Sequence, residues 1–292
     1  MHWAAAEMAR AGDIQVKPAV HEVRTDPLTG LRAIVATAGA PSTDAPLLQA
    51  DPPAPAPDPQ PGLYAALAAR GAHEVIVNDP QPVTALADLA VEQVQAAVER
   101  WRERMRAHAG AAYVHVCVDE AGAAGATAAP SRAQLYALDF VPAVVARERE
   151  RFSAHAQRTM GSNLLEDLVQ EEVRRRERIV AIDAEAVLLC PYASSGPYAL
   201  MVAPRRRRDR FEDDGPSGAA LLHDALSRLA RHFGTSPPLS LWVRTAPRDA
   251  ERFCWRIDIL PRLAPSPGLE LGTGLHRTDV APEQAAAELR AA

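Results

Sequence analysis

A long amphipathic helix between short β-prone segments is the feature that most constrains how this sequence can fold. In Val83–His108 the apolar residues recur at spacings of three and four, as they do on a helix with one buried face. Strands are predicted before this helix at His73–Asn78 and after it at Tyr113–Val118 and Gln134–Leu138. This order of strand, helix and strands favours an α+β fold.

The second half of the chain repeats the same order. A helical region at 144–176 is broken at Gly161-Ser162, where Asn163 and Glu166 have the spacing of a capping box. The remaining elements are expected as strands near 179–182, 186–190 and 198–203, a helix at about 217–233, strands near 239–245 and 253–260, and a helix at Pro282–Ala291. We therefore predict the α+β class with mixed, mostly antiparallel sheets and flanking helices, in two halves at residues 21–150 and 151–292.

The start of the first half has two further features. Residues 1–20 are expected to form an N-terminal arm, and His21–Ala36 is a predicted hairpin around a turn cluster at 26–30. Asp51–Gly62 is dense in proline, which cannot donate to a sheet ladder and favours extended polyproline geometry. We expect this segment, residues 51–62, to be an insert outside the sheet.

Composition and charge exclude several classes of protein. The net charge is −5, so no global basic field favours nucleic acid as a partner. The cysteines Cys117, Cys190 and Cys254 are odd in number and lack C-x-x-C spacing, so neither a disulfide framework nor a zinc knuckle is expected. The first residues have no signal-peptide core, and no run of about 18 apolar residues occurs. We expect a cytoplasmic protein with no membrane association.

Several short motifs occur in a characteristic order along the chain. They are DPLTG at 26–30, HEVIV at 73–77, GATAAPSRAQLYALDFVP at 125–142, CPYAS at 190–194 and ILPRL at 259–263. In this order they resemble the galactose-1-phosphate uridylyltransferase family of the histidine-triad superfamily, over nearly the whole chain. The resemblance implies two fused histidine-triad-like halves, commonly in dimers, and UDP-glucose–hexose-1-phosphate uridylyltransferase activity that depends on a histidine nucleophile.

The chain departs from this family where the family does its chemistry. The family pattern G-[AC]-[ST]-x-x-H-P-H-x-Q is matched at Gly125, Ala126, Thr127 and Gln134. Its H-P-H residues are replaced by Pro130, Ser131 and Arg132. A second family strand, H-W-H-[IL]-E-[IL], reads Cys254-Trp255-Arg256-Ile257-Asp258-Ile259 here, so both of its histidines are replaced, by Cys254 and Arg256, and its glutamate by Asp258.

The zinc ligands that the resemblance implies are replaced as well. Their positions correspond to Ala45, Leu48, Pro82 and Pro130, none of which can bind zinc. We therefore expect no metal and no cofactor. A separate pair, His115 and Cys117 on one predicted strand face, is interpreted as packed core because no partner ligand has suitable spacing.

The replaced residues predict the loss of histidine-dependent nucleotidyl transfer. An arginine at position 132 stays protonated and cannot form a phosphoramidate. Ser131 is a hydroxyl without an evident base, and no histidine is expected beside it. Cys254 is a thiol whose pKa should stay high without a neighbouring base.

Two hypotheses remain for the site that these positions define. In the first, Arg256 and Asp258, two apart on one strand face, pair with each other and fill an abandoned pocket. In the second, Arg132 and Arg256 converge on an anion, with Gln134 donating a hydrogen bond. The ligand-binding candidates are thus Arg132, Gln134, Arg256 and Asp258.

Three functions remain open at this stage. The chain could be a pseudoenzyme that binds a nucleotide, a phosphorylated small molecule or a protein partner. It could instead be a nucleotidyltransferase or hydrolase that acts on a phosphorylated or nucleotide-sugar metabolite with Asp258 or Cys254, or a structural partner that forms dimers with itself or with an active paralogue.

An arginine run at 205–208, with Arg210, allows two interpretations. The acidic residues at 212–214 can neutralise it as a solvated loop, or the run can form a patch for an anionic partner.

Overall fold

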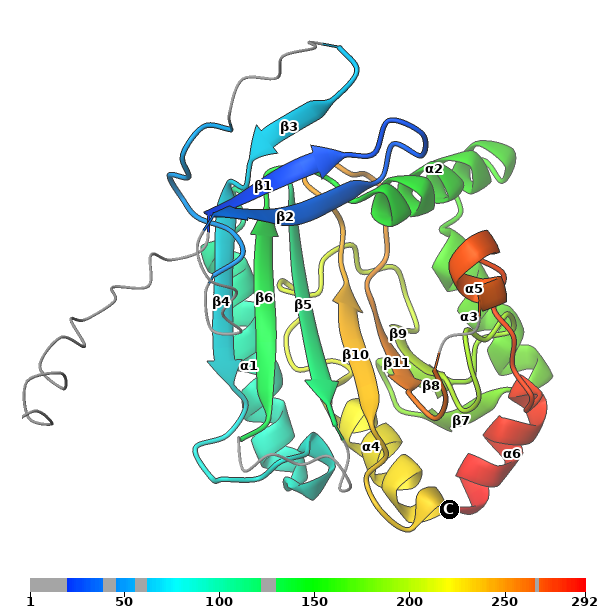
Figure 1. The fold of residues 1–292 in the computed structure, drawn as a ribbon. Coiled ribbons are helices and arrows are strands. Elements are labelled where there is room, and N and C mark those ends of the chain that lie inside the picture. Colours follow the sequence, from blue (N-terminus) through cyan, green and yellow to red (C-terminus); the bar gives the residue numbers. More distant parts are fainter. Residues whose placement is uncertain (1–19, 39–45, 56–61, 122–129, 266–267) are drawn as a thin grey trace, which may run out of the picture. The chain divides into compact units, whose positions relative to one another are not determined.

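The computed structural model describes residues 20–38, 46–55, 62–121, 130–265 and 268–292, which form two compact units at Met1–Ala72 and His73–Ala292. In the first unit, strand β1 (Val20–Thr25) pairs antiparallel with β2 (Arg32–Ala38) and, on its other side, with β3 (Ala65–Ala68). Figure 1 shows this small sheet in blue and cyan.

The predicted hairpin in the first unit is confirmed. Asp26 Oδ1 accepts the backbone N–H of Leu28 at 2.8 Å, and Gly30 closes the turn with a φ of 71° that suits glycine. Strand β3 was not predicted, because its sequence AALA lacks the β-branched residues typical of strands. The predicted arm lies outside the described residues except for Val20, and so does the part of the proline-rich insert at 56–61.

The second unit is built on an eight-stranded sheet with the order β4-β6-β5-β10-β11-β9-β8-β7. Its strands are β4 (Gly71–Val77), β5 (Tyr113–Glu120), β6 (Arg132–Leu138), β7 (Ile179–Ile182), β8 (Ala186–Leu189), β9 (Leu200–Pro204), β10 (Leu239–Arg244) and β11 (Arg256–Pro261). From β6 to β7 each strand pairs antiparallel with its neighbour. The predicted fold class, mixed α+β with antiparallel sheets and flanking helices, is confirmed.

Helices cover the sheet of the second unit. Helix α1 (Val91–Ala107) packs on β5 and β6, and α4 (Ala219–Phe233) packs on α1, β8 and β9. Figure 1 shows α1 behind β4 and β6. Helices α2 (Ala143–Arg158) and α3 (Leu164–Arg175) pack on each other and share an apolar cluster with β8 and β9. Helix α6 (Pro282–Ala291), at the predicted position, contacts β7 and α4.

The first predicted helix is shorter than its apolar pattern suggests. A 3-10 turn, η1 (Leu86–Asp88), comes before α1, and Leu89 and Ala90 are extended. The reason is polar: Glu120 Oε1 accepts the Leu86 N–H at 2.8 Å, and the Gln93 side chain accepts the Ala90 N–H at 2.9 Å. The N–H groups of Leu86 and Ala90 thus bond to side chains and not to backbone carbonyls one turn earlier, and α1 begins only at Val91.

The predicted apolar stripe of α1 is buried, and the last predicted strands are present, one of them with a later start. Val94, Val98, Trp101 and Met105 are fully buried, as the pattern indicates. The strand expected at 253–260 begins only at Arg256, and the Trp255 N–H just before it donates to the carbonyl of Arg208, in the loop after β9, at 2.9 Å. The short helix α5 (Gly268–Thr273) was not predicted.

The predicted boundary between the two halves falls inside α2, and strands from both halves share one sheet. Cys117 of β5 stands opposite Trp242 of β10 in the register. The two-half organisation therefore stays a prediction about internal similarity, and it is distinct from the division into compact units. Within the described part of the chain, none of the helices is both long and apolar enough to span a membrane.

Asn163 joins the start of α3 to a segment that is distant in the sequence. Its Oδ1 accepts the backbone N–H groups of Leu165 and Glu166, while its Nδ2 donates to the carbonyls of Arg252 and Phe253. We expect Asn163→Ala to lower the free energy of unfolding by about 2 kcal/mol, since both the cap and the buried donor are lost. Asn163→Ser keeps an acceptor oxygen for the cap without placing a charge against these carbonyls, and should cost about half as much.

Urea denaturation of the two variants and the parent protein measures this difference. Equal losses in Asn163→Ala and Asn163→Ser would contradict a stabilising role for the N-cap acceptor.

Candidate functional site

The predicted site residues lie mainly on one face of the central strands. Along β5, β6, β10 and β11 the buried residues alternate with more exposed ones, and the buried set includes Val116, Leu135, Leu241 and Ile257. The opposite face, which we call the open face, carries Arg132, Gln134, Arg256 and Asp258. In the register Gln134, Cys117, Trp242 and Asp258 form one row across the sheet.

At the β6 end of the open face, uncharged polar groups surround Gln134. Its Oε1 accepts the Tyr136 hydroxyl at 2.5 Å and lies 3.2 Å from His73 Nε2. The His73 ring stacks on Tyr136 with centroids 4.5 Å apart. Because the carbonyl oxygen of Gln134 is occupied, its amide nitrogen is the group that can donate to a ligand.

Two histidines on this face have pKa values below their ordinary value. Burial lowers the pKa of His73, although its contact with Gln134 acts in the opposite direction. Burial also lowers the pKa of His115 to about 4, with a further contribution from nearby Arg244. In the sequence His73 is marked only as the first residue of a predicted strand, since nothing there shows that β4 lies next to β6.

Arg132 stands at the edge of this group. Its side chain is exposed, and no described residue forms a hydrogen bond or ion pair with it. The guanidinium group is therefore available to an anion in solution. The motif residues Gly125, Ala126 and Thr127 lie outside the described residues.

At the other end of the face, Arg256 is held by two carboxylates. Its Nε lies 2.9 and 3.0 Å from the two oxygens of Asp258, and its Nη2 lies 2.9 Å from Glu148 Oε1. Arg244 Nε is 3.5 Å from Glu148 Oε2. Burial acts to lower the pKa of Arg256, but Asp258 and Glu148 outweigh it and raise the pKa above its ordinary value.

These four side chains, which we call the arginine–carboxylate cluster, balance two positive charges with two negative ones. The predicted pairing of Arg256 with Asp258 is confirmed. Glu148 was missed because it lies on α2, more than a hundred residues before its partner, with no motif to mark it.

The prediction that Arg132 and Arg256 converge on one anion is wrong. Strands β5 and β10 separate β6 from β11, which places the two residues about 14 Å apart across the strands. Arg132 comes two residues before Gln134, and Arg256 comes two residues before Asp258, which lies in the same row across the sheet. Because β6 and β11 run in opposite directions, the two offsets add to a displacement of about 13 Å along the strands. A single phosphate cannot contact both guanidinium groups at this separation.

Ser131 is buried away from the open face. Its hydroxyl accepts from Asn78 Nδ2 at 2.8 Å and donates to Glu120 Oε1 at 3.0 Å. Asn78 in turn accepts from Trp101 Nε1 at 2.9 Å. Burial raises the pKa of Glu120 to about 7. This network joins β6 to α1 and η1, so it explains Ser131 as a structural residue.

The cysteines are free and poorly suited to nucleophilic chemistry. Cys254 is fully buried in the apolar cluster with Phe152 and Phe253, and burial raises the pKa of its thiol to about 12. Burial raises the pKa of Cys117 to about 12 as well. A thiolate at Cys254 is thus disfavoured by its environment.

Metal ligation finds no support among the side chains that the structure places. No three His, Cys, Asp or Glu residues in the described ranges are grouped to hold a metal ion. Of the positions that correspond to family zinc ligands, Leu48 is buried, Pro82 and Pro130 lie in segments without regular structure, and Ala45 is outside the described residues. The expected absence of a metal stays a prediction.

Comparison with known proteins agrees with the sequence motifs. A family model described as galactose-1-phosphate uridyl transferase, N-terminal domain, matches residues 44–142. The chain is 28% identical over 257 residues to the galactose-1-phosphate uridylyltransferase of Haemophilus influenzae, an alignment that covers 82% of this chain and 72% of that protein. The resemblance to this family is therefore confirmed.

Solved structures show the same fold at lower identity. A structure of uridylyltransferase matches with a TM-score of 0.82 and 23% identity, over 92% of this chain and 98% of that one. An ADP-glucose phosphorylase from Arabidopsis thaliana with bound ADP-glucose matches with a TM-score of 0.68 and 22% identity, over 77% of this chain and 75% of that one. At these identities the likeness concerns the fold alone.

Glu120 predicts a distinctive pH dependence of stability. Its pKa of about 7 in the folded protein exceeds its ordinary value of 4.5, so the folded state binds more protons between these values. The free energy of unfolding should therefore fall as pH rises from about 4.5 to 7, by on the order of 2–3 kcal/mol from this group. Glu120→Gln should lose this component.

Urea denaturation at pH 5 and pH 8 compares the parent protein with Glu120→Gln. Neighbouring Asp88 raises the same pKa, so Asp88→Asn serves as a control that should reduce the component without removing it. Parallel pH profiles for the parent protein and Glu120→Gln would contradict the assignment.

The arginine–carboxylate cluster predicts an asymmetry between single and double replacements. Arg256→Met leaves Glu148 and Asp258 as neighbouring carboxylates with only Arg244 nearby, and should lower the free energy of unfolding by about 3 kcal/mol. Adding Asp258→Leu should restore most of the loss, because Glu148 keeps its contact with Arg244.

Chemical denaturation of the single and double variants measures both effects. A double variant no more stable than Arg256→Met would show that the cluster is not held by mutual charge neutralisation.

Proposed function

We propose that this galactose-1-phosphate uridylyltransferase-like protein does not transfer a nucleotidyl group, and that it binds a nucleotide or phosphorylated small molecule non-covalently on its open face. One observation carries the proposal: an exposed arginine, Arg132, stands where the resemblance places the family's nucleophile, on the same strand face as the hydrogen-bonding groups around Gln134. Anion binding is the chemistry that this residue supplies.

Covalent transfer needs a group that attacks phosphorus and can later leave. A guanidinium ion has no free lone pair for this step and stays protonated in water. Its hydroxyl neighbour Ser131 is buried on the opposite side of β6, bonded to Asn78 and Glu120. Cys254 and Asp258 are engaged as well, one in the core and the other with Arg256.

The polar groups on the face suit a ligand with one anionic part and an uncharged polar part. Arg132 can contact a phosphate, and the Gln134 amide, two residues along the same strand, can donate to a neighbouring acceptor. Tyr136 and His73 add ring surface and hydrogen-bonding atoms without adding charge at neutral pH. The neutralised arginine–carboxylate cluster contributes no net attraction for an anion.

Isotope exchange tests the absence of transfer. Labelled glucose 1-phosphate and unlabelled UDP-glucose are incubated with the protein, and we expect no label in UDP-glucose above a protein-free control. Measurable exchange would overturn this part of the proposal.

Thermal unfolding tests the binding part. A panel of uridine, adenosine and guanosine nucleotides, sugar phosphates and UDP-sugars is added at millimolar concentration. A ligand at about 100 times its dissociation constant stabilises the folded state by about 2.7 kcal/mol, which gives a clear shift. We expect a shift that disappears in Arg132→Ala but persists in Arg231→Ala, a matched loss of an exposed arginine on α4.

No shift with any ligand, or equal loss in both variants, would show that Arg132 does not define a binding site.

A further inference from the structure

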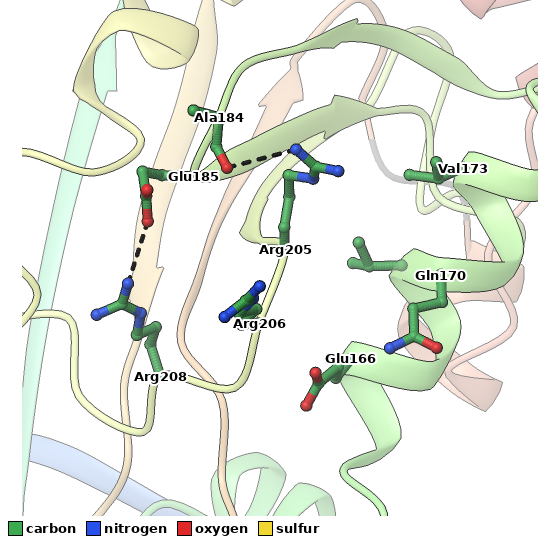
Figure 2. Close-up of a pocket in the computed structure, with 9 residues that line it drawn as sticks. Glu166, Gln170, Val173, Ala184, Glu185, Arg205, Arg206 and Arg208 are labelled. Atoms are coloured by element: carbon green, nitrogen blue, oxygen red, sulfur yellow. Dashed lines mark hydrogen bonds and ion pairs between the residues drawn. The ribbon is translucent and has the colours of Figure 1, made fainter.

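A pocket in the His73–Ala292 unit shares no lining residue with the open face. It has a volume of about 560 Å³ and lies between α3, the turn from β7 to β8, and the segment after β9. Figure 2 shows Arg205 and Arg206 facing Glu166, Gln170 and Val173 across the pocket. Its volume is in the range of about 300–1,000 Å³ that small-molecule sites occupy.

The arginines of this pocket differ in how their charge is balanced. Arg208 is paired with Glu185 at 3.1 Å and with Asp214 at 3.2 Å. Arg205 contacts only the backbone carbonyls of Asp183 and Ala184, at 3.3 and 3.4 Å. For Arg206 no hydrogen bond or ion pair occurs with a residue that the structure describes. Two guanidinium groups in the pocket are thus without a described carboxylate partner.

The neighbouring arginines show that this is not a general property of the loop. Arg207 forms a two-point ion pair with Asp209, at 2.6 and 2.7 Å, and does not line the pocket. Arg210 pairs with Glu212 at 3.1 Å. The predicted neutralisation by residues 212–214 therefore fits Arg208 and Arg210, Arg207 is neutralised by Asp209 instead, and the pocket-lining Arg205 and Arg206 are the exceptions.

The opposite wall supplies hydrogen-bonding groups on an apolar base. Glu166 accepts only a backbone N–H from Arg207, at 3.4 Å, and Gln170 presents an exposed amide. Between them Val169 is almost fully buried and Val173 packs on the apolar cluster. A carboxylate and an amide in this position suit the hydroxyl groups of a ligand.

We propose that this pocket binds a small phosphorylated sugar or polyol, with the phosphate on Arg205 and Arg206 and the hydroxyls on Glu166 and Gln170. Guanidinium groups suit phosphate because they donate in a planar, two-point geometry. Glu166 disfavours a ligand that is anionic throughout, since it places negative charge on the α3 side of the pocket, while Glu185 is already paired with Arg208. The site is independent of the proposed function of the open face.

Isothermal titration of the full chain at low ionic strength tests this proposal, with glucose 6-phosphate, glucose and inorganic phosphate as the probes. We expect glucose 6-phosphate to bind more tightly than either fragment. Arg205→Ala and Arg206→Ala should each weaken it by about tenfold. Arg207→Ala removes the same charge from the same loop outside the pocket, and should leave the affinity within about twofold. Circular dichroism confirms that each variant is folded.

A second variant separates the two parts of the ligand. Gln170→Ala should weaken glucose 6-phosphate but leave inorganic phosphate unchanged. Absence of binding to the parent protein, equal loss in Arg206→Ala and Arg207→Ala, or equal affinity for inorganic phosphate and glucose 6-phosphate would each overturn the proposal. Loss of binding in Arg132→Ala with retention in Arg206→Ala would overturn it too, since the ligand would then lie on the open face.

Discussion

The antiparallel pairing of β5 with β10 is the constraint on which the rest of the second unit depends. These strands are more than a hundred residues apart in the chain, and their register places Cys117 opposite Trp242. Because side chains alternate along a strand, this one register decides which residues of β6 and β11 share the open face. A shift by one residue would bury Arg256 and Asp258 against the helices and expose Ile257, so the apolar face of the sheet enforces the register.

The same register explains why Arg132 and Arg256 have different surroundings and different roles. Arg256 lies within reach of α2, whose Glu148 joins Asp258 to neutralise it. Arg132 lies on the far side of β5 and β10, next to the hydrogen-bonding groups around Gln134 and, in the continued register, across from Asp119 of β5, with which it forms no described ion pair. One guanidinium stabilises the packing of a helix on the sheet, and the other stays exposed to solvent. Residue type alone does not determine function here, because strand order sets the surroundings.

Much of the fold could be predicted from the sequence because its signals are local. The stripe of Val94, Val98, Trp101 and Met105 predicts a buried helix face, and Asn163 predicts the start of α3. The start of α1 was placed too early, since the Glu120 carboxylate that captures the Leu86 N–H lies 34 residues away. The site was harder for the same reason. The Arg256–Asp258 pair is local, whereas Glu148 and His73 reach the open face only through tertiary structure.

Charge balance gives the clearest physical distinction between the two arginine-bearing regions. In the arginine–carboxylate cluster every guanidinium lies within 4 Å of a carboxylate, as also holds for Arg207 and Arg208 in the loop after β9. Such pairs have already exchanged water for protein partners, so an incoming anion would have to displace a carboxylate. Arg205 and Arg206 have no described carboxylate as an ion-pair partner, and Arg132 forms no described ion pair although Asp119 lies across from it on β5. Anion recognition in this protein is therefore best sought where guanidinium groups lack a carboxylate partner, rather than where arginines are most numerous.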